Sequence, residues 1–189
     1  YMTWSSRLLL ETALVLVLGQ PLIIWAALDI GMVLVLFSGL RELLAPEKQM
    51  KDSLILALLI CVYPFFHMGS AGWVTTTVIY LWPLSLAVYA ISGMARRLRG
   101  VRVQWYRYIL YGMSAIFSCN NELIAVMVLA AAIAGFIYAV QIRKLYAIPV
   151  SGGVISLAGL LFALITPGNA VRMAKETITW MPDFPTFSL

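Results

Sequence analysis

The stretch LIAVMVLAAAIAGFIYAVQI, residues 123–142, contains no Asp, Glu, Lys or Arg and is followed directly by Arg143 and Lys144. A helix of this length is about 30 Å long, which matches the hydrocarbon core of a bilayer. Hydrophobic residues make up 62% of the 189 residues and charged residues 11%, so a soluble fold would have a largely apolar exterior. We therefore predict an all-α fold, a polytopic transmembrane helical bundle.

The other apolar segments predict a single transmembrane domain, residues 1–189, with about six membrane helices including one interfacial helix. Residues 5–19 are assigned to the interfacial helix, because this segment is short, contains Glu11 and ends in a Gly-Gln-Pro turn. The short spans 53–66 and 108–117 are expected to break at their outer ends inside the bundle. The predicted spans are residues 22–40, 53–66, 79–94, 108–117, 123–142 and 147–165.

The basic residues divide unevenly between the two sets of loops that these spans create. Only Arg7, Arg172 and Lys175 fall on one side, and ten Lys and Arg residues fall on the other. The ten are Arg41, Lys48, Lys51, Arg96, Arg97, Arg99, Arg102, Arg107, Arg143 and Lys144. Cytoplasmic loops of membrane proteins carry an excess of Lys and Arg, so we expect the loops with ten to be cytoplasmic. The segments 67–78 and 118–122 and the polar tail 166–189 are then external.

Two carboxylates interrupt apolar segments, Asp29 and Glu122. Ionisable groups within spans usually face the bundle interior or a cavity. For Asp29 we favour a structural carboxylate hydrogen-bonded to a neighbouring helix over a functional role. Glu122 follows Asn120 and Asn121 at the outer end of a span. It fits a general base with a raised pKa and, equally well, a helix-start carboxylate beside capping asparagines.

The tail begins with a Pro-Gly-Asn turn that ends at Asn169 and is followed by Arg172. A planar guanidinium at headgroup depth is suited to bind a lipid phosphate, whereas the alternative is a snorkelling arginine that closes a helix. Trp73 and Tyr80 fit either a sugar-stacking surface or aromatic anchors at the membrane interface.

Several kinds of site have no sequence signal. The single histidine, His67, has no partner at metal-ligand spacing, and there is no Gly-rich phosphate loop or Ser/His/Asp arrangement. We therefore expect no cofactor and no metal. The net charge of +5 is explained by the topology of the loops, so we expect the lipid bilayer as a partner and no nucleic acid.

Five motifs, in this order, cover the chain nearly end to end and together resemble one family. They are Tyr1-x-x-Trp4-x-x-Arg7, Gly72-Trp73-Val74-Thr75-Thr76-Thr77-x-x-Tyr80-Leu81-Trp82-Pro83, Asn120-Asn121-Glu122, Pro167-Gly168-Asn169-x-x-Arg172 and Glu176-x-x-x-Trp180-x-Pro182-Asp183-Phe184. The family comprises large multispan membrane proteins of Gram-positive bacteria that have no assigned reaction. It is similar to polyprenyl-phosphate-dependent glycosyltransferases of the GT-C type.

The resemblance implies a location in the bacterial plasma membrane and a chain that is the N-terminal part of a longer protein. It also implies a transferase that moves a sugar from an undecaprenyl-phosphate carrier to a cell-envelope glycan at the outer face. Glu122 is then the candidate catalytic residue, although such enzymes usually carry this carboxylate on the first external loop, where this sequence has Glu11. The candidate substrate-binding residues are Arg172, Asn169, Asn120, Asn121, Trp73, Tyr80 and Arg7.

The alternative is a non-enzymatic transporter or flippase-like protein, in which Asp29 and Glu122 are intramembrane substrate or proton sites. A transporter needs polarity near the membrane midplane, whereas a lipid-linked transferase needs a cleft on one side. Most of the polar residues here fall on one side, which favours the transferase. We expect residues 67–78, 120–122 and 167–172 to converge in one external cleft.

The charge distribution predicts the accessibility of introduced cysteines in intact cells. In a background that lacks the two native cysteines, Lys175→Cys should react with a membrane-impermeant reagent. Arg99→Cys should react only after the membrane is permeabilised, because its loop is predicted to be cytoplasmic. The opposite labelling pattern would overturn the predicted topology.

Overall fold

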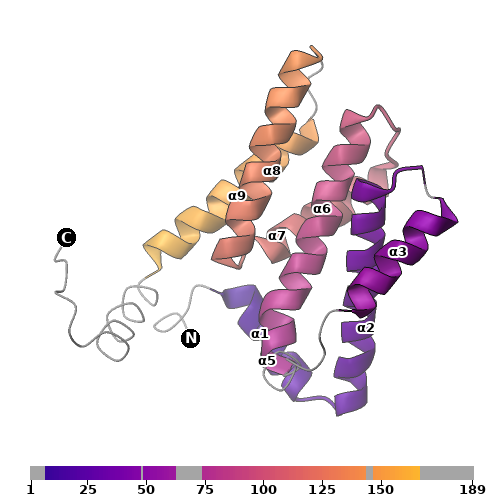
Figure 1. Cartoon of the computed structure of the whole chain (residues 1–189). Helices are drawn as coiled ribbons and strands as arrows, with labels where there is room; N and C mark the ends of the chain where they lie inside the picture. The colour runs from indigo at the N-terminus through magenta and orange to yellow at the C-terminus, as the bar shows by residue number, and fades with distance from the viewer. Residues whose placement is uncertain (1–6, 48, 63–73, 144–146, 167–189) are drawn as a thin grey trace, which may run out of the picture.

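The computed structural model describes residues 7–47, 49–62, 74–143 and 147–166, and within these ranges the chain forms helices and turns without a β-strand. The predicted all-α fold is confirmed. The helices are α1 (Leu8–Leu18), α2 (Leu22–Leu44), α3 (Met50–Cys61), α5 (Val74–Thr76), the π-helix η2 (Thr77–Leu81), α6 (Trp82–Leu98), α7 (Trp105–Ser118), α8 (Glu122–Gln141) and α9 (Ala147–Ile165) (Figure 1).

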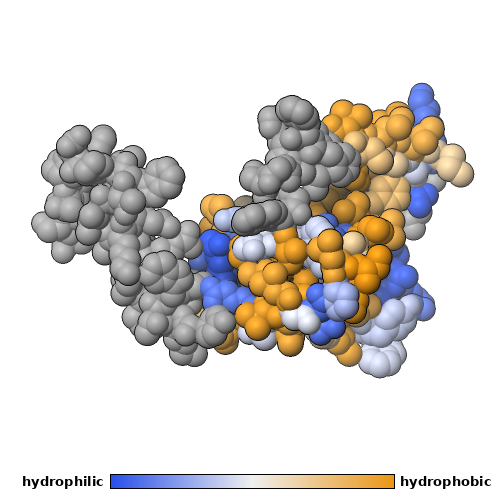
Figure 2. Space-filling view, turned by 90° about the horizontal axis from the view of Figure 1, so that it is seen from below, coloured by the Kyte–Doolittle hydropathy of each residue, from blue (hydrophilic) through white to orange (hydrophobic). Residues whose placement is uncertain are grey.

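Four helical segments among the described residues are long and apolar enough to cross a membrane. They are α2, the continuous segment Val74–Leu98, α8 and α9. Their outward faces carry large apolar side chains, such as Ile23 at 74% and Leu164 at 81% exposure. Apolar side chains also predominate on the face seen from the α1 end, where hydrophilic patches interrupt them (Figure 2). Such a surface is suited to lipid, which supports the prediction of a membrane protein with transmembrane helices.

The helices α3 and α7 are shorter, at 12 and 14 residues. At 1.5 Å per residue, α7 is only about 21 Å long, less than the thickness of the hydrocarbon core. This agrees with the short spans expected at these two places. The helix α3 begins at Met50, three residues before the predicted start.

The predicted loop 67–78 is wrong for its last five residues, because the chain is helical from Val74 onward. Three consecutive threonines made this segment look like a loop. In the structure the Thr77 hydroxyl donates to the carbonyl of Val74 at 3.2 Å and accepts from the indole Nε1 of Trp25 at 2.9 Å. A threonine whose hydroxyl bonds within its own helix is compatible with a buried helical position. Residues 67–73 lie outside the described residues.

The centre of the bundle is α6, which contacts α2, α7, α8 and α9. In the most apolar part of Val74–Leu98, 56% of residues are buried, against 6% for α2. Small side chains on a membrane helix allow neighbouring backbones to approach closely. The small buried residues of α6 are Ser85, Ala87, Ala90, Ser92 and Gly93.

Two glycines occupy the closest helix crossings. A Cβ at Gly39 of α2 would lie 2.9 Å from Cγ1 of Val88 and 3.1 Å from the backbone nitrogen of Tyr89. A Cβ at Gly93 of α6 would lie 2.5 Å from the ring of Tyr111 on α7. Larger residues at these positions would therefore separate the helices.

The end of the bundle with the basic loops is held together by arginines of α6. Arg96 donates to the carboxylate of Glu42 on α2 at 2.8 Å. Arg99 donates to the backbone carbonyls of Glu42 and Leu43 at 2.7 and 3.0 Å. Carbonyls in the last turn of a helix lack intrahelical partners, so Arg99 stabilises the C-terminus of α2. The C-terminal ends of α2, α6 and α8 point upward in Figure 1, whereas α1 and α5 lie at the bottom.

The tight crossing of α2 and α6 predicts a difference between two glycines of the same helix. Gly39→Ala should lower the free energy of unfolding by about 1–3 kcal/mol, because the added methyl group meets the backbone of α6. Gly31→Ala is the matched control, since a Cβ there meets nothing within 4 Å. Thermal unfolding in detergent measures both variants. Equal stability of the two would mean that Gly39 is not a packing constraint.

Candidate functional site

At the end of the bundle opposite the basic loops, three segments distant in sequence meet. They are the start of α1, the π-helix η2 and the turn between α7 and α8. We call the five polar residues that they contribute the polar cluster: Arg7, Tyr80, Asn120, Asn121 and Glu122. Its central contact joins Arg7 to Glu122, with Nε and Nη2 donating to the same carboxylate oxygen at 3.1 and 3.0 Å.

The Arg7–Glu122 ion pair is mostly enclosed by protein. The two side chains are 14% and 28% exposed. Burial lowers the pKa of the Arg7 guanidinium, but the hydrogen bonds and charge interactions with Glu122 and Tyr80 outweigh it, so the pKa is raised. The cation in turn favours the ionised form of the carboxylate. The polar cluster therefore pairs a carboxylate with a guanidinium at hydrogen-bond distance.

Tyr80 forms the open side of the cluster. The guanidinium carbon of Arg7 lies 5.8 Å from the centre of the Tyr80 ring, within range of a cation–π interaction. The side chain is 48% exposed. Because Tyr80 belongs to the π-helical segment, the helix is locally wider there, and such segments are frequent at functional sites.

Asn120 binds the start of α1. Its side-chain oxygen accepts from the backbone N–H groups of Leu9 and Leu10 at 2.9 and 3.3 Å. These groups in the first turn have no partner within the helix, and the N-cap residue Arg7 supplies no side-chain cap. A residue more than a hundred positions away thus caps α1 and fixes Arg7 beside Glu122.

Asn121 is fully buried and has the capping role that the sequence left open as an alternative to a functional site. Its side-chain oxygen accepts from the N–H groups of Leu123 and Ile124 at 3.1 and 3.4 Å and so caps α8. Its side-chain nitrogen donates to the carbonyl of Ile79 at 3.1 Å, which joins α8 to η2. The capping interpretation is confirmed for Asn121, whereas Asn120 caps a different helix.

The last part of α9 reaches the same end of the bundle. A Cβ at Gly159 would lie 2.5 Å from the carbonyl oxygen of Cys119, so α9 packs directly on the turn that holds Asn120. Three predicted site residues, Trp73, Asn169 and Arg172, lie outside the described residues. The other five lie together in the polar cluster.

Asp29 lies apart from the polar cluster. Its carboxylate accepts a hydrogen bond from the indole Nε1 of Trp82 at 3.0 Å, which joins α2 to α6. The predicted bond to a neighbouring helix is therefore confirmed. Among the described residues no group of three or more His, Cys, Asp or Glu side chains is arranged to bind a metal.

Sequence reasoning did not predict the ion pair between Arg7 and Glu122. The two residues are separated by 115 positions, and no local pattern relates them. The charge distribution gave the one indication of this pair, because it assigned both Arg7 and Glu122 to the side with few basic residues.

No family model, curated protein or solved structure matches the chain. The resemblance described above therefore stays a prediction, and the geometry of the polar cluster is the main support for a functional proposal.

The ion pair predicts a non-additive effect of two substitutions on stability. Arg7→Gln and Glu122→Gln should each destabilise the protein, and the double variant should be scarcely worse than either. The expected coupling is about 1–3 kcal/mol, the range for hydrogen bonds between charged groups. Unfolding in detergent measures the cycle. Arg102→Gln combined with Glu122→Gln is the control and should be additive; additivity in the first cycle would mean that the pair contributes nothing.

Proposed function

We propose that this chain is part of a membrane glycosyltransferase that uses a sugar carried by undecaprenyl phosphate and adds it to a cell-envelope glycan. The observation that supports the proposal is the Arg7–Glu122 ion pair beside Tyr80, at the end of the bundle opposite the basic loops. Because the loops with ten Lys and Arg residues are predicted to be cytoplasmic, the positive-inside rule supports a location of the polar cluster at the outer face of a bacterial plasma membrane.

The polar cluster contains the three kinds of group that such a transfer uses. The acceptor hydroxyl oxygen forms a bond to the anomeric carbon while the bond from that carbon to the lipid phosphate breaks. The hydroxyl proton passes to the Glu122 carboxylate, which acts as general base. The phosphate leaves with the electron pair, and a guanidinium stabilises its growing charge. The exposed ring of Tyr80 offers a surface for the sugar.

The ion pair also suggests how the Glu122 carboxylate is held before the substrate binds. A bound phosphate competes with Glu122 for the guanidinium of Arg7, because both ligands are oxyanions that accept from it. Until then the cation favours the ionised carboxylate, which is the form that accepts a proton. Arg172, predicted from the sequence as a phosphate ligand, would supply a second guanidinium, with Asn169 and Trp73 as further substrate contacts.

Lipid access to the polar cluster is supported by the apolar residues beside it. Leu8 adjoins Arg7 and is 41% exposed, and Leu123 adjoins Glu122 and is 72% exposed. A polyprenyl chain can lie against this lipid-facing surface while its phosphate reaches the guanidinium. A water-soluble donor has no apolar chain that would bind to such a surface.

A transporter is less well supported. Of the Asp, Glu, Lys and Arg residues in the described part of the chain, Asp29 is the one that lies well inside a long helix, and it is bonded to Trp82. The other charged residues of the long helices lie near their ends. A one-sided site favours chemistry on a membrane-bound substrate over passage through the membrane.

The proposal predicts the effects of two substitutions in the full-length protein. Glu122→Gln keeps the shape of the side chain and removes the base, so sugar transfer from a polyprenyl-phosphate donor should fall by about 100-fold or more. Arg172→Lys keeps the charge but loses the planar fork, so it should also impair turnover. Radiolabelled donor and isolated envelope glycan measure the rate.

Asp52→Asn is the control, because Asp52 is in the first turn of α3 at the opposite end and should leave the rate unchanged. Unchanged transfer in both test variants would make Glu122 and Arg172 structural. A protein that gives no donor-dependent transfer but moves a solute across proteoliposomes would replace the transferase with the transporter.

A further inference from the structure

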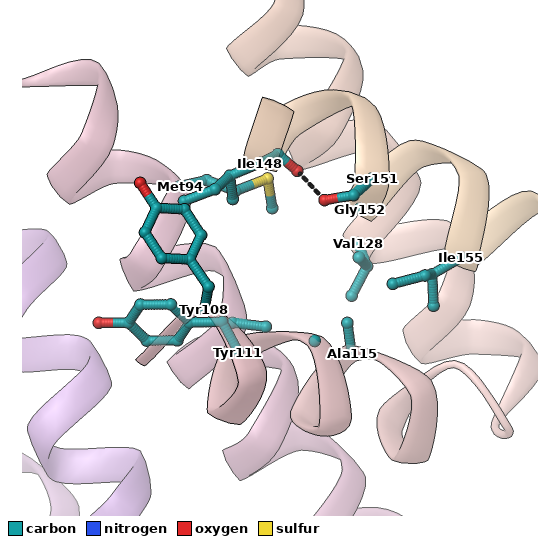
Figure 3. A pocket seen from close by; sticks show the side chains of 11 residues that line it. Met94, Tyr108, Tyr111, Ala115, Val128, Ile148, Ser151, Gly152 and Ile155 are labelled. Atoms are coloured by element: carbon teal, nitrogen blue, oxygen red, sulfur yellow. Dashed lines mark hydrogen bonds between the residues drawn. The ribbon is translucent and has the colours of Figure 1, made fainter. Parts of the chain in front are cut away.

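A cavity lies among α6, α7, α8 and α9, away from the polar cluster. Its volume is about 50 Å³ and it is partly open to the outside. Met94, Tyr108, Tyr111, Gly112 and Ile155 are among its lining residues (Figure 3). It is nearest the basic end of the bundle, since Met94 lies in the last turns of α6 and Tyr108 in the first turn of α7.

The interior of the cavity is apolar. Its one serine, Ser151, donates its hydroxyl to the carbonyl of Ile148 at 3.0 Å, so this group is already satisfied within α9 (Figure 3). The hydroxyl groups of Tyr108 and Tyr111 are turned away from Val128 and Ile155 at the other end of the cavity (Figure 3). An apolar chain therefore fits this cavity better than a polar ligand.

The cavity adjoins a lipid-facing surface. Tyr108 lines it and is 37% exposed, and its neighbours Ile109 and Met113 on α7 are 52% and 63% exposed. From Tyr108 to Ala115 the lining residues cover about 10 Å along α7. A few methylene groups fit inside, and the rest of a chain can continue along the exposed face of α7.

A basic residue, Arg107, lies near the end of the cavity that is nearest the basic loops. Arg107 lies one turn before Tyr111, so the two residues share one face of α7. Tyr111 also lines the cavity, so the arginine and the apolar space lie on the same face of α7. Basic pockets between membrane helices on the cytoplasmic side are suited to anionic lipid headgroups.

We propose that the cavity binds one acyl chain of an anionic phospholipid and that Arg107 binds the phosphate of that lipid. The occupant is a bilayer lipid because the cavity is continuous with the lipid-facing surface of α7. It is anionic because Arg107 lies in the first turn of α7, near the cavity, and the loop just before α7 carries a second cation, Arg102. The headgroup contact at Arg107 is at the opposite end from the polar cluster, and the proposal does not depend on the glycosyltransferase proposal.

Gly112 allows a direct test, because it lines the cavity and a Cβ there meets nothing within 4 Å. Gly112→Leu should therefore place an apolar side chain in the cavity. Delipidated protein is titrated with phosphatidylglycerol or phosphatidylcholine, and bound lipid is counted by native mass spectrometry. Wild type should prefer phosphatidylglycerol, and Gly112→Leu should weaken its binding by about tenfold, as expected when roughly two methylene groups are no longer buried.

Gly31→Leu is the matched control, since Gly31 also has open space around it but belongs to α2 and does not line the cavity. Its lipid binding should equal that of wild type. Thermal unfolding of both variants verifies that they fold. Equal loss in both variants, or none in Gly112→Leu, would overturn the proposal.

The headgroup contact is tested by charge-matched variants of one loop. Arg107→Gln should lower the affinity for phosphatidylglycerol by about fivefold and that for phosphatidylcholine by less, because the choline cation offsets the charge of its phosphate. Arg102→Gln removes the same charge from an exposed position and should have a smaller effect. A photoreactive residue at position 112 should label lipid. Labelling of a second copy or of another protein, or equal binding of the two lipids, would contradict an anionic lipid site.

Discussion

The lack of water in the hydrocarbon core is the constraint on which this structure depends, because polar groups there must find partners within the protein. Trp25 of α2 bonds to Thr77, and Trp82 of α6 bonds to Asp29. Ser156 bonds back to carbonyls of its own helix, α9. The hydrogen bonds of the two indoles also join α2 to η2 and α6. The need of buried polar groups for partners therefore helps to determine how these helices pack.

The unpaired backbone groups at helix ends also need partners, and side chains from other parts of the chain supply them. Asn120 caps α1, Asn121 caps α8, and Arg99 satisfies carbonyls at the end of α2. The two ends of the bundle differ in what these contacts produce. At both ends a guanidinium lies beside a carboxylate, Arg96 with Glu42 and Arg7 with Glu122. At the end opposite the basic loops, the pair also lies against the half-exposed ring of Tyr80. That difference is why we propose the polar cluster as the substrate-binding site.

The fold could be predicted from the sequence because long apolar segments in a bilayer have few alternatives to a helix. The cap at Asn121 was also predictable, since an asparagine directly before an apolar helix is a local signal. The helical start at Val74 was not, because the threonine run reads as polar until its hydrogen bonds within the bundle are known. The cap that Asn120 makes on α1 and the pairing of Arg7 with Glu122 depend on tertiary contacts across more than a hundred residues. No local pattern encodes such contacts.

The central claim is that the polar cluster binds a lipid-linked sugar phosphate, and photolabelling measures this most directly. A polyprenyl-phosphate sugar with a photoreactive group near the phosphate is activated in membranes that contain the full-length protein, and labelled peptides are mapped. The account predicts labels next to Arg7 and Glu122, at Leu8 and Leu123, that unlabelled donor displaces. Labels spread evenly over the lipid-facing helices, or displaceable labels confined to the basic end at residues 94–107, would contradict it.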